Sequence, residues 1–94
     1  MLCTILCTDK PNHEPLRIGT RQAHLDYLGG FKDRVVIAGP LQTDDGARMT
    51  GSLLIMDFAD RKLAEAFAAN DPYNKAGLFE NVVIRRWKKV IPAD

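Results

Sequence analysis

The sequence is poor in cysteine: only Cys3 and Cys7 occur among its 94 residues. Two thiols are too few for a disulfide framework, and no His or Cys pair completes a spacing typical of a zinc site. If residues 2–8 form a strand, the Cα atoms of Cys3 and Cys7 lie about 13 Å apart. A disulfide needs Cα atoms within about 7 Å, so these cysteines cannot bridge each other. We expect free thiols, no metal and a cytoplasmic location.

Long apolar runs and an excess of one charge are also missing. No apolar stretch approaches the ~20 residues that span a bilayer, and the N-terminal run has no basic start and no cleavage site. We therefore expect no secretory signal and no membrane partner. Thirteen basic and twelve acidic side chains leave a net charge of +1, which argues against a nucleic-acid partner. There is no phosphate-binding loop and no dinucleotide fingerprint, so we expect no cofactor.

Hydrophobic periodicity and turn residues divide the chain into six elements. Strands are predicted at 2–8, 34–38, 52–58 and 81–91, and helices at 15–28 and 61–69. Gly39-Pro40 is expected to end the second strand, because proline cannot donate to a central ladder. The order β-α-β-β-α-β predicts an α+β, ferredoxin-like fold, with an antiparallel sheet and two helices on one face. A chain of this length forms one domain, residues 1–94.

Both faces of the predicted sheet carry apolar side chains. In the first strand, Leu2 and Leu6 face one side, and the residues between them that face the other side are also apolar. In the third strand, Leu53 and Ile55 face one side, and apolar residues again face the other. Two helices cover only one face, so the other needs a second cover. The simplest cover is the same sheet of another copy across a two-fold axis. The sequence therefore predicts a homodimer through the sheet face.

The first predicted helix carries a polar stripe within its apolar arc. Arg17, Arg21, His24 and Leu28 follow one another at spacings of 4, 3 and 4, which places them on one face. In a structural interpretation His24 is a hydrogen-bonded core histidine, and the arginines bury only their stems. In a functional interpretation His24 lines a pocket and carries protons. Arg17 and Arg21 would then receive an anionic or phenolate-like substrate.

Asp71 also has two interpretations. Asp-Pro is typical of an N-cap followed by proline at the first helical position, here starting a short turn through Tyr73. Alternatively, its carboxylate lies beside His24, fixes the imidazole tautomer and raises its basicity. Ser52 is either a strand-edge serine or a pocket residue. We expect His13, in a polar loop, to be solvated.

Several short stretches of the sequence together resemble a known family. They are Asp9-Lys10-Pro11, Arg21-Gln22-Ala23-His24-Leu25, Gly39-Pro40-Leu41, Gly51-Ser52-Leu53-Leu54-Ile55, Asn70-Asp71-Pro72-Tyr73 and Ala76-Gly77-Leu78-Phe79. The chain resembles the YciI-like family of the dimeric α+β barrel superfamily over essentially its whole length. The resemblance implies a protomer that dimerises through its sheet, with a catalytic His-Asp pair in a cleft.

The matching positions for that pair are His24 and Asp71, and Arg21, Ser52 and Tyr73 fall on positions that line the pocket. One characterised activity in the family removes chloride from a chlorinated hydroxyhydroquinone. The resemblance thus implies a cofactor-independent enzyme acting on a small, hydroxylated or chlorinated aromatic substrate by His-Asp proton transfer, of lyase (dehydrochlorinase) or isomerase type. The alternatives are a non-catalytic small-molecule-binding or stress-related dimeric module and a purely structural interaction module.

Overall fold

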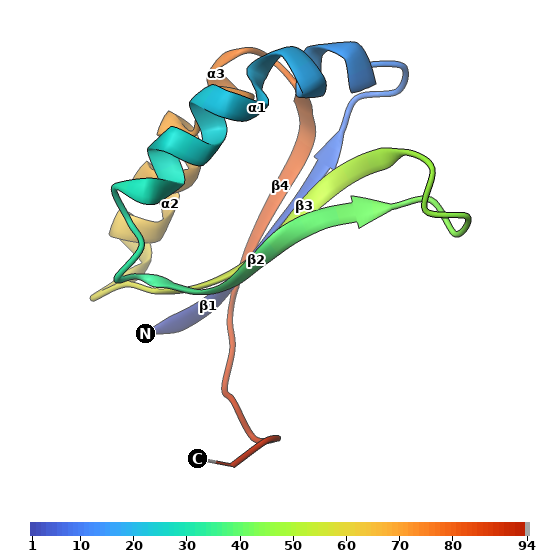
Figure 1. Ribbon diagram of the computed structural model, residues 1–94. Helices are drawn as coiled ribbons and strands as arrows, with labels where there is room; N and C mark the ends of the chain where they lie inside the picture. Colours follow the sequence, from blue (N-terminus) through green and yellow to red (C-terminus); the bar gives the residue numbers. More distant parts are fainter. Residues whose placement is uncertain (94) are drawn as a thin grey trace.

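The computed structural model describes residues 1–93. In chain order its elements are β1 (Leu2–Asp9), α1 (Glu14–Gly29), β2 (Val35–Gln42), β3 (Met49–Asp57), α2 (Arg61–Asn70), α3 (Pro72–Lys75) and β4 (Phe79–Arg86). The strands form one antiparallel sheet in the order β2-β3-β1-β4, and the helices lie over one of its faces (Figure 1). This confirms the predicted α+β, ferredoxin-like fold.

The second strand does not end at Gly39-Pro40, as predicted, but continues through both residues to Gln42. Pro40 pairs with Ser52 of β3, and β2 has no neighbour on its other side because it is an edge strand. A proline that lacks an N–H is tolerated at a sheet edge, where that group would face solvent. The prediction was wrong because it treated the strand as a central one.

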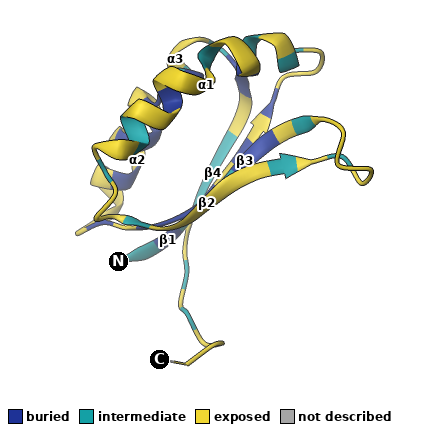
Figure 2. Ribbon diagram, viewed as in Figure 1, coloured by how far each residue is buried: buried dark blue, intermediate teal, exposed yellow. Residues whose placement is uncertain are grey.

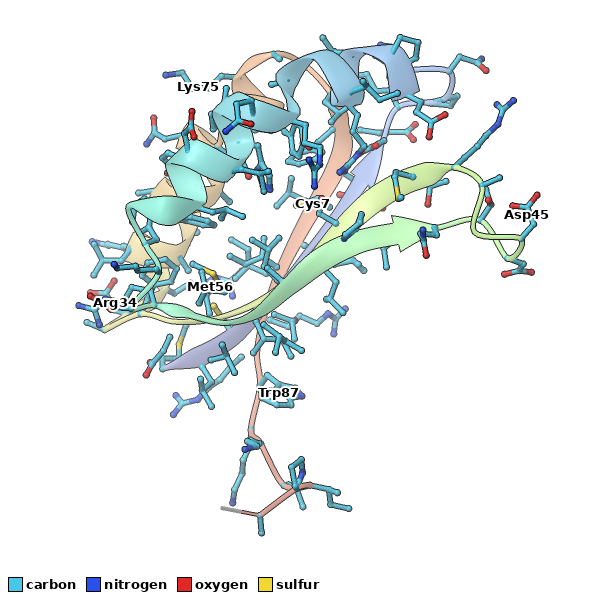
Figure 3. All side chains as sticks on the ribbon, in the orientation of Figure 1. Cys7, Arg34, Asp45, Met56, Lys75 and Trp87 are labelled. Carbon is cyan, nitrogen blue, oxygen red and sulfur yellow. The ribbon has the colours of Figure 1, made fainter. Side chains whose placement is uncertain are left out.

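The last strand is also shorter than predicted and ends at Arg86, not at residue 91. Its partner is the start of β1, where Cys3 pairs with Arg86. Beyond that point β1 has almost no chain left to pair with, apart from a bond from the Trp87 amide to the Leu2 carbonyl. The segment after Trp87 therefore leaves the sheet and runs away from the helices (Figures 1 and 3).

The core fills the layer between the sheet and the helices. Alternate residues of β1, from Cys3 to Cys7, point into it, and both cysteines are buried free thiols; Figure 3 shows Cys7 and Met56 in this layer. Asp60 caps α2 by accepting the Leu63 amide at 3.0 Å. In the sequence, Leu63, Ala66 and Phe67 follow one another at i, i+3 and i+4, a spacing that predicts a buried stripe, but α2 turns Ala64, Phe67 and Ala68 inward. Phe67 is buried in both cases, because it belongs to two possible stripes of i, i+3 and i+4 spacing that lie one residue apart.

Within residues 1–93, no helix lies over the other face of the sheet (Figure 1). Leu6 of β1 is 39% exposed and Ile37 of β2 is 59% exposed, and Figure 2 shows exposure along most of β2. These side chains lie opposite the helix-covered face because side chains alternate along a strand. Among residues 1–93, no helix combines the length and the apolar character needed to cross a membrane.

Candidate functional site

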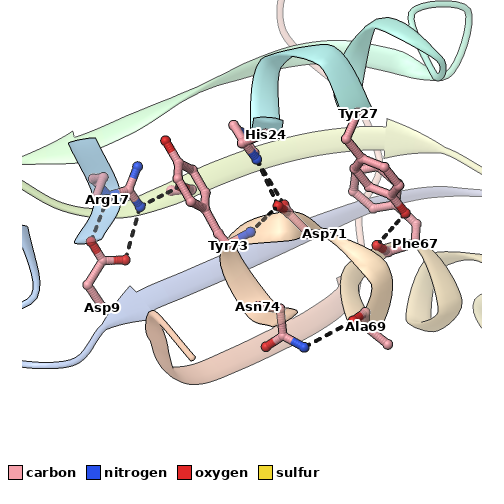
Figure 4. A network of polar contacts seen from close by, with 10 residues as sticks. Asp9, Arg17, His24, Tyr27, Phe67, Ala69, Asp71, Tyr73 and Asn74 are labelled. Carbon is pink, nitrogen blue, oxygen red and sulfur yellow. Dashed lines mark hydrogen bonds and ion pairs between the residues drawn. The ribbon is translucent and has the colours of Figure 1, made fainter. Parts of the chain in front are cut away.

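His24 and Asp71 meet between α1 and the start of α3. The Nδ1 atom of His24 lies 2.9 Å from Oδ1 and 3.1 Å from Oδ2 of Asp71, and both side chains are buried (Figure 4). Asp71 also caps α3, since its Oδ1 accepts the Tyr73 amide at 2.9 Å. The two interpretations of Asp71 are therefore compatible. A carboxylate oxygen accepts the hydrogen bond, so Nδ1 of His24 is the donor, and in the neutral imidazole Nε2 is then the nitrogen with the lone pair.

Tyr73 packs against the imidazole. The two rings are stacked with centroids 4.1 Å apart and planes inclined by 19°. Burial raises the pKa of Tyr73 above its ordinary value, although Arg17 and Arg21 act in the opposite direction. Tyr73 therefore remains a neutral phenol at physiological pH and can donate a hydrogen bond.

Arg17 lies on the other side of Tyr73 in a buried ion pair with Asp9. Its Nε donates to Asp9 Oδ2 at 2.7 Å and its Nη2 to Asp9 Oδ1 at 3.0 Å, a two-bond fork. Nη2 also donates to Ser52 Oγ at 2.8 Å. Burial alone would lower the pKa of Arg17, but the hydrogen bond and the charge of Asp9 outweigh it and raise that pKa. Arg17 is thus a permanent cation whose charge is balanced locally.

Asp9 is the residue that sequence reasoning missed. The predicted first strand ends at residue 8, whereas Asp9 is the last residue of β1 and is buried. The signal was present in the alternation of the strand, because Asp9 continues the inward series Cys3, Ile5 and Cys7. An acid in register with three core residues needs a buried partner.

A cavity of about 470 Å³ lies between α1 and strands β2 and β3. Its lining combines five polar side chains with an apolar remainder: Arg17, Ile18, Arg21, His24, Leu25, Leu28, Ala38, Gly39, Pro40, Met49, Ser52, Leu54 and Tyr73. Nε2 of His24 makes no hydrogen bond, and among residues 1–93 no buried side-chain nitrogen or oxygen lacks a partner. Nε2 is therefore open to this cavity, as are the Tyr73 hydroxyl and Nη1 of Arg17 by the same argument.

The structure brings together all six residues that the sequence singled out. His24, Arg17, Ser52 and Tyr73 line the cavity from buried positions, Arg21 lines it from an exposed one, and Asp71 supports His24 from behind. His13 lies apart from them, where its Nδ1 donates to the Pro11 carbonyl at 2.7 Å. Among residues 1–93 no group of three or more His, Cys, Asp or Glu side chains is arranged to hold a metal ion.

Comparison with known proteins shows full-length relatives. Protein YciI of Escherichia coli O6:H1 is 37% identical over 97 aligned positions, which cover 96% of this chain and 99% of that protein. An uncharacterised protein of Haemophilus influenzae is 34% identical over the same shares of the two chains. The match therefore includes every element that builds the cavity.

Solved structures of other proteins share the fold of this chain. The dehydrochlorinase TftG of Burkholderia phenoliruptrix, which acts on 5-chloro-2-hydroxyhydroquinone and was solved with 2,5-dihydroxybenzoquinone, superposes with a TM-score of 0.90. It is 37% identical, with complete coverage of both chains. An antibiotic biosynthesis monooxygenase, 10% identical over 96% of this chain and 99% of its own, shares the fold with a TM-score of 0.56. The family model of the YCII-related domain matches residues 1–88, and the chain belongs to this family.

Proposed function

We propose that this protein is a cofactor-independent enzyme that acts on a small hydroxylated or chlorinated aromatic compound by proton transfer at His24. The proposal depends on how the two nitrogen atoms of the His24 ring are placed. Asp71 holds Nδ1 of the imidazole at 2.9 Å, and Nε2 opens into a cavity of about 470 Å³. A cavity of this volume suits a single-ring compound.

The surrounding groups suit a substrate that becomes an anion. Arg17 and Arg21 are the charged side chains of the lining, and the Tyr73 hydroxyl adds a neutral donor. The carboxylates of Asp9 and Asp71 do not line the cavity, because each is turned toward its own cationic or imidazole partner. A phenolate or enolate oxygen would therefore meet donors and positive charge, which stabilise developing negative charge.

Dehydrochlorination is the reaction that best matches these groups. In the keto tautomer of such a substrate, the ring carbon that bears chlorine has taken up the proton of a hydroxyl group. Nε2 of His24 accepts a second hydroxyl proton from this tautomer, and the electron pair released expels chloride, so the compound loses one HCl overall and becomes a hydroxyquinone. No oxidant or reductant is needed, because the departing chloride carries the electron pair. Asp71 stabilises the imidazolium formed in this step. An isomerase would use the same pair to move a proton between two carbon atoms.

The test is chloride release from 5-chloro-2-hydroxyhydroquinone, the compound on which the relative TftG acts. We expect His24→Gln to lower the rate by about 10²- to 10⁴-fold, the usual contribution of a general acid or base. His13→Gln is the matched control, since His13 lies in the loop away from the cavity, and it should keep the wild-type rate. Equal rates for wild type and His24→Gln would remove His24 from the mechanism.

A non-catalytic binding module is the competing function, and the largely apolar lining favours it. In that case 2,5-dihydroxybenzoquinone binds to the purified protein, but none of the hydroxylated aromatics tested is converted. Calorimetric titration with this compound, run beside the chloride assay, separates the two functions. We retain a cytoplasmic location in this proposal, because both thiols are free.

We further propose that the protein is a homodimer through the uncovered sheet face. Leu6 lies on this face and is 39% exposed, whereas Leu63 on α2 is 49% exposed on the opposite side of the molecule. Leu6→Glu should dissociate the dimer, because it places a charge within the apolar contact. The control Leu63→Glu should leave it intact. Sedimentation equilibrium at micromolar concentration measures both, and a stable wild-type monomer would contradict the proposal.

A further inference from the structure

Asp9 lies outside the cavity, yet it is joined to the cavity through one side chain. Its carboxylate is buried and receives two bonds from Arg17, at 2.7 and 3.0 Å. These bonds fix the plane of the guanidinium, because a fork of two parallel bonds to a carboxylate leaves it no freedom to rotate. Ser52 accepts a third bond from the same guanidinium at 2.8 Å and attaches it to β3.

The fixed guanidinium lies against Tyr73, whose ring also stacks on His24. The Cζ atom of Arg17 is 4.6 Å from the centroid of the Tyr73 ring, and the His24 ring centroid is 4.1 Å from it. Arg17 and His24 are about two turns apart on one face of α1, and Figure 4 shows the Tyr73 ring between them. The ring therefore has a planar cation on one side and the imidazole on the other.

The His24 imidazole is also held on the side that faces away from Arg17. Asp71 accepts both the His24 Nδ1–H and the backbone amide of Tyr73. The imidazole is thus held by a hydrogen bond at its edge and by a ring on its face. The hydrogen bond alone leaves rotation about the Nδ1–Asp71 axis free, and the stacked ring removes that freedom. Arg17 covers the other face of the stacked ring, and Phe79 meets that ring edge-on with centroids 5.9 Å apart.

We propose that Asp9 is a positioning residue for His24, acting through the guanidinium of Arg17 and the ring of Tyr73. Without Asp9, the guanidinium would be a buried charge with no counterion, and it would move toward the water of the cavity. Tyr73 would lose its support on the face turned toward Arg17, and the imidazole would lose its fixed orientation toward the substrate. The catalytic part of this proposal rests on the proposed function, but the geometric part does not.

The experiment follows the His24 ring protons by NMR, because the stacked Tyr73 ring shifts them upfield. Tyr73→Leu sets the scale for complete loss of this shift. We expect Asp9→Asn to lose most of it, and the control Asp44→Asn, which removes a carboxylate from an exposed loop, to keep it. Arg17→Lys preserves the buried charge pair but has no plane to cover the ring. It should also lose the shift, and it decides the question if Asp9→Asn does not fold.

Folded Asp9→Asn and Arg17→Lys proteins with the wild-type His24 shift would overturn the proposal. If the wild type releases chloride, both variants should do so more slowly, by up to roughly 10²-fold, the loss that a misplacement of about 1 Å causes. Equal melting temperatures of Arg17→Lys and wild type would show that this loss is not one of stability. If the wild type releases no chloride, the proposed reaction fails, and the NMR shift still decides the positioning role.

Discussion

Replacing Asp71 with asparagine separates the chemistry of the site from its structure. Asparagine has almost the same shape and is an equally good N-cap, so it can still accept the Tyr73 amide. It removes only the charge beside His24. We therefore expect Asp71→Asn to change the free energy of unfolding by less than about 1 kcal/mol, whereas Asp71→Ala, which also loses the cap, should cost about 0.5–2 kcal/mol for the cap alone.

The effect on activity should be larger. A hydrogen bond to a charged group contributes about 1.5–3 kcal/mol, against about 0.5–1.5 kcal/mol for a neutral one. The imidazolium that forms during the reaction thus loses about 1–2 kcal/mol, which slows chloride release about 5- to 30-fold. If the amide rotates and its NH₂ group donates to Nδ1 of His24, the wrong tautomer forms and the loss approaches about 10⁴-fold.

Asp60 provides the matched control, because it caps α2 in the same way, with Leu63 N at 3.0 Å from its carboxylate and no histidine beside it. Asp60→Asn should leave both the rate and the His24 tautomer unchanged. The measurements are chloride release, thermal unfolding and the nitrogen NMR spectrum of His24. An unprotonated Nδ1 in the wild type, or an Asp71→Asn variant at the full wild-type rate, would refute the reasoning.

Three further predictions concern stability and thiol chemistry. A Cβ at Gly51 would lie 2.3 Å from the Cys7 carbonyl oxygen, so Gly51→Ala should destabilise by about 1–3 kcal/mol in urea unfolding. Gly19 of α1 has nothing within 4 Å of that position, so Gly19→Ala should stabilise by about 0.5–1 kcal/mol; a gain at Gly51 would contradict the clash. Burial raises the pKa of Cys7 from 9.0 to about 12, so the folded protein keeps a proton that the unfolded chain loses. The free energy of unfolding should therefore fall by up to about 4 kcal/mol as the pH rises from about 9 to 12, and thiol reagents at pH 8 should modify only the unfolded protein.

The amino-acid sequence alone determined the order of the elements and the polar face of α1. Both depend on local periodicity, which strands and helices express through side chains that alternate or repeat at fixed angles. The stripe of Arg17, Arg21 and His24 lies within an apolar arc, so a buried or cavity-lining role could be predicted without coordinates. The two roles of Asp71 could also be predicted from the sequence. The Asp-Pro pair indicated the helix cap, and the family resemblance indicated the pairing with His24.

Only the tertiary structure decided which polar groups are partners. Asp9 and Arg17 lie on different elements, and Tyr73 enters between Arg17 and His24 from α3, far along the chain. No local pattern encodes such distances, because they depend on how α1 and α3 pack over the sheet. The edge position of β2 likewise made Pro40 compatible with a strand, and that position follows from strand order. Periodicity specifies which face of an element is polar, whereas packing specifies what that face touches, because contacts between elements arise only when the whole sheet and its helices assemble.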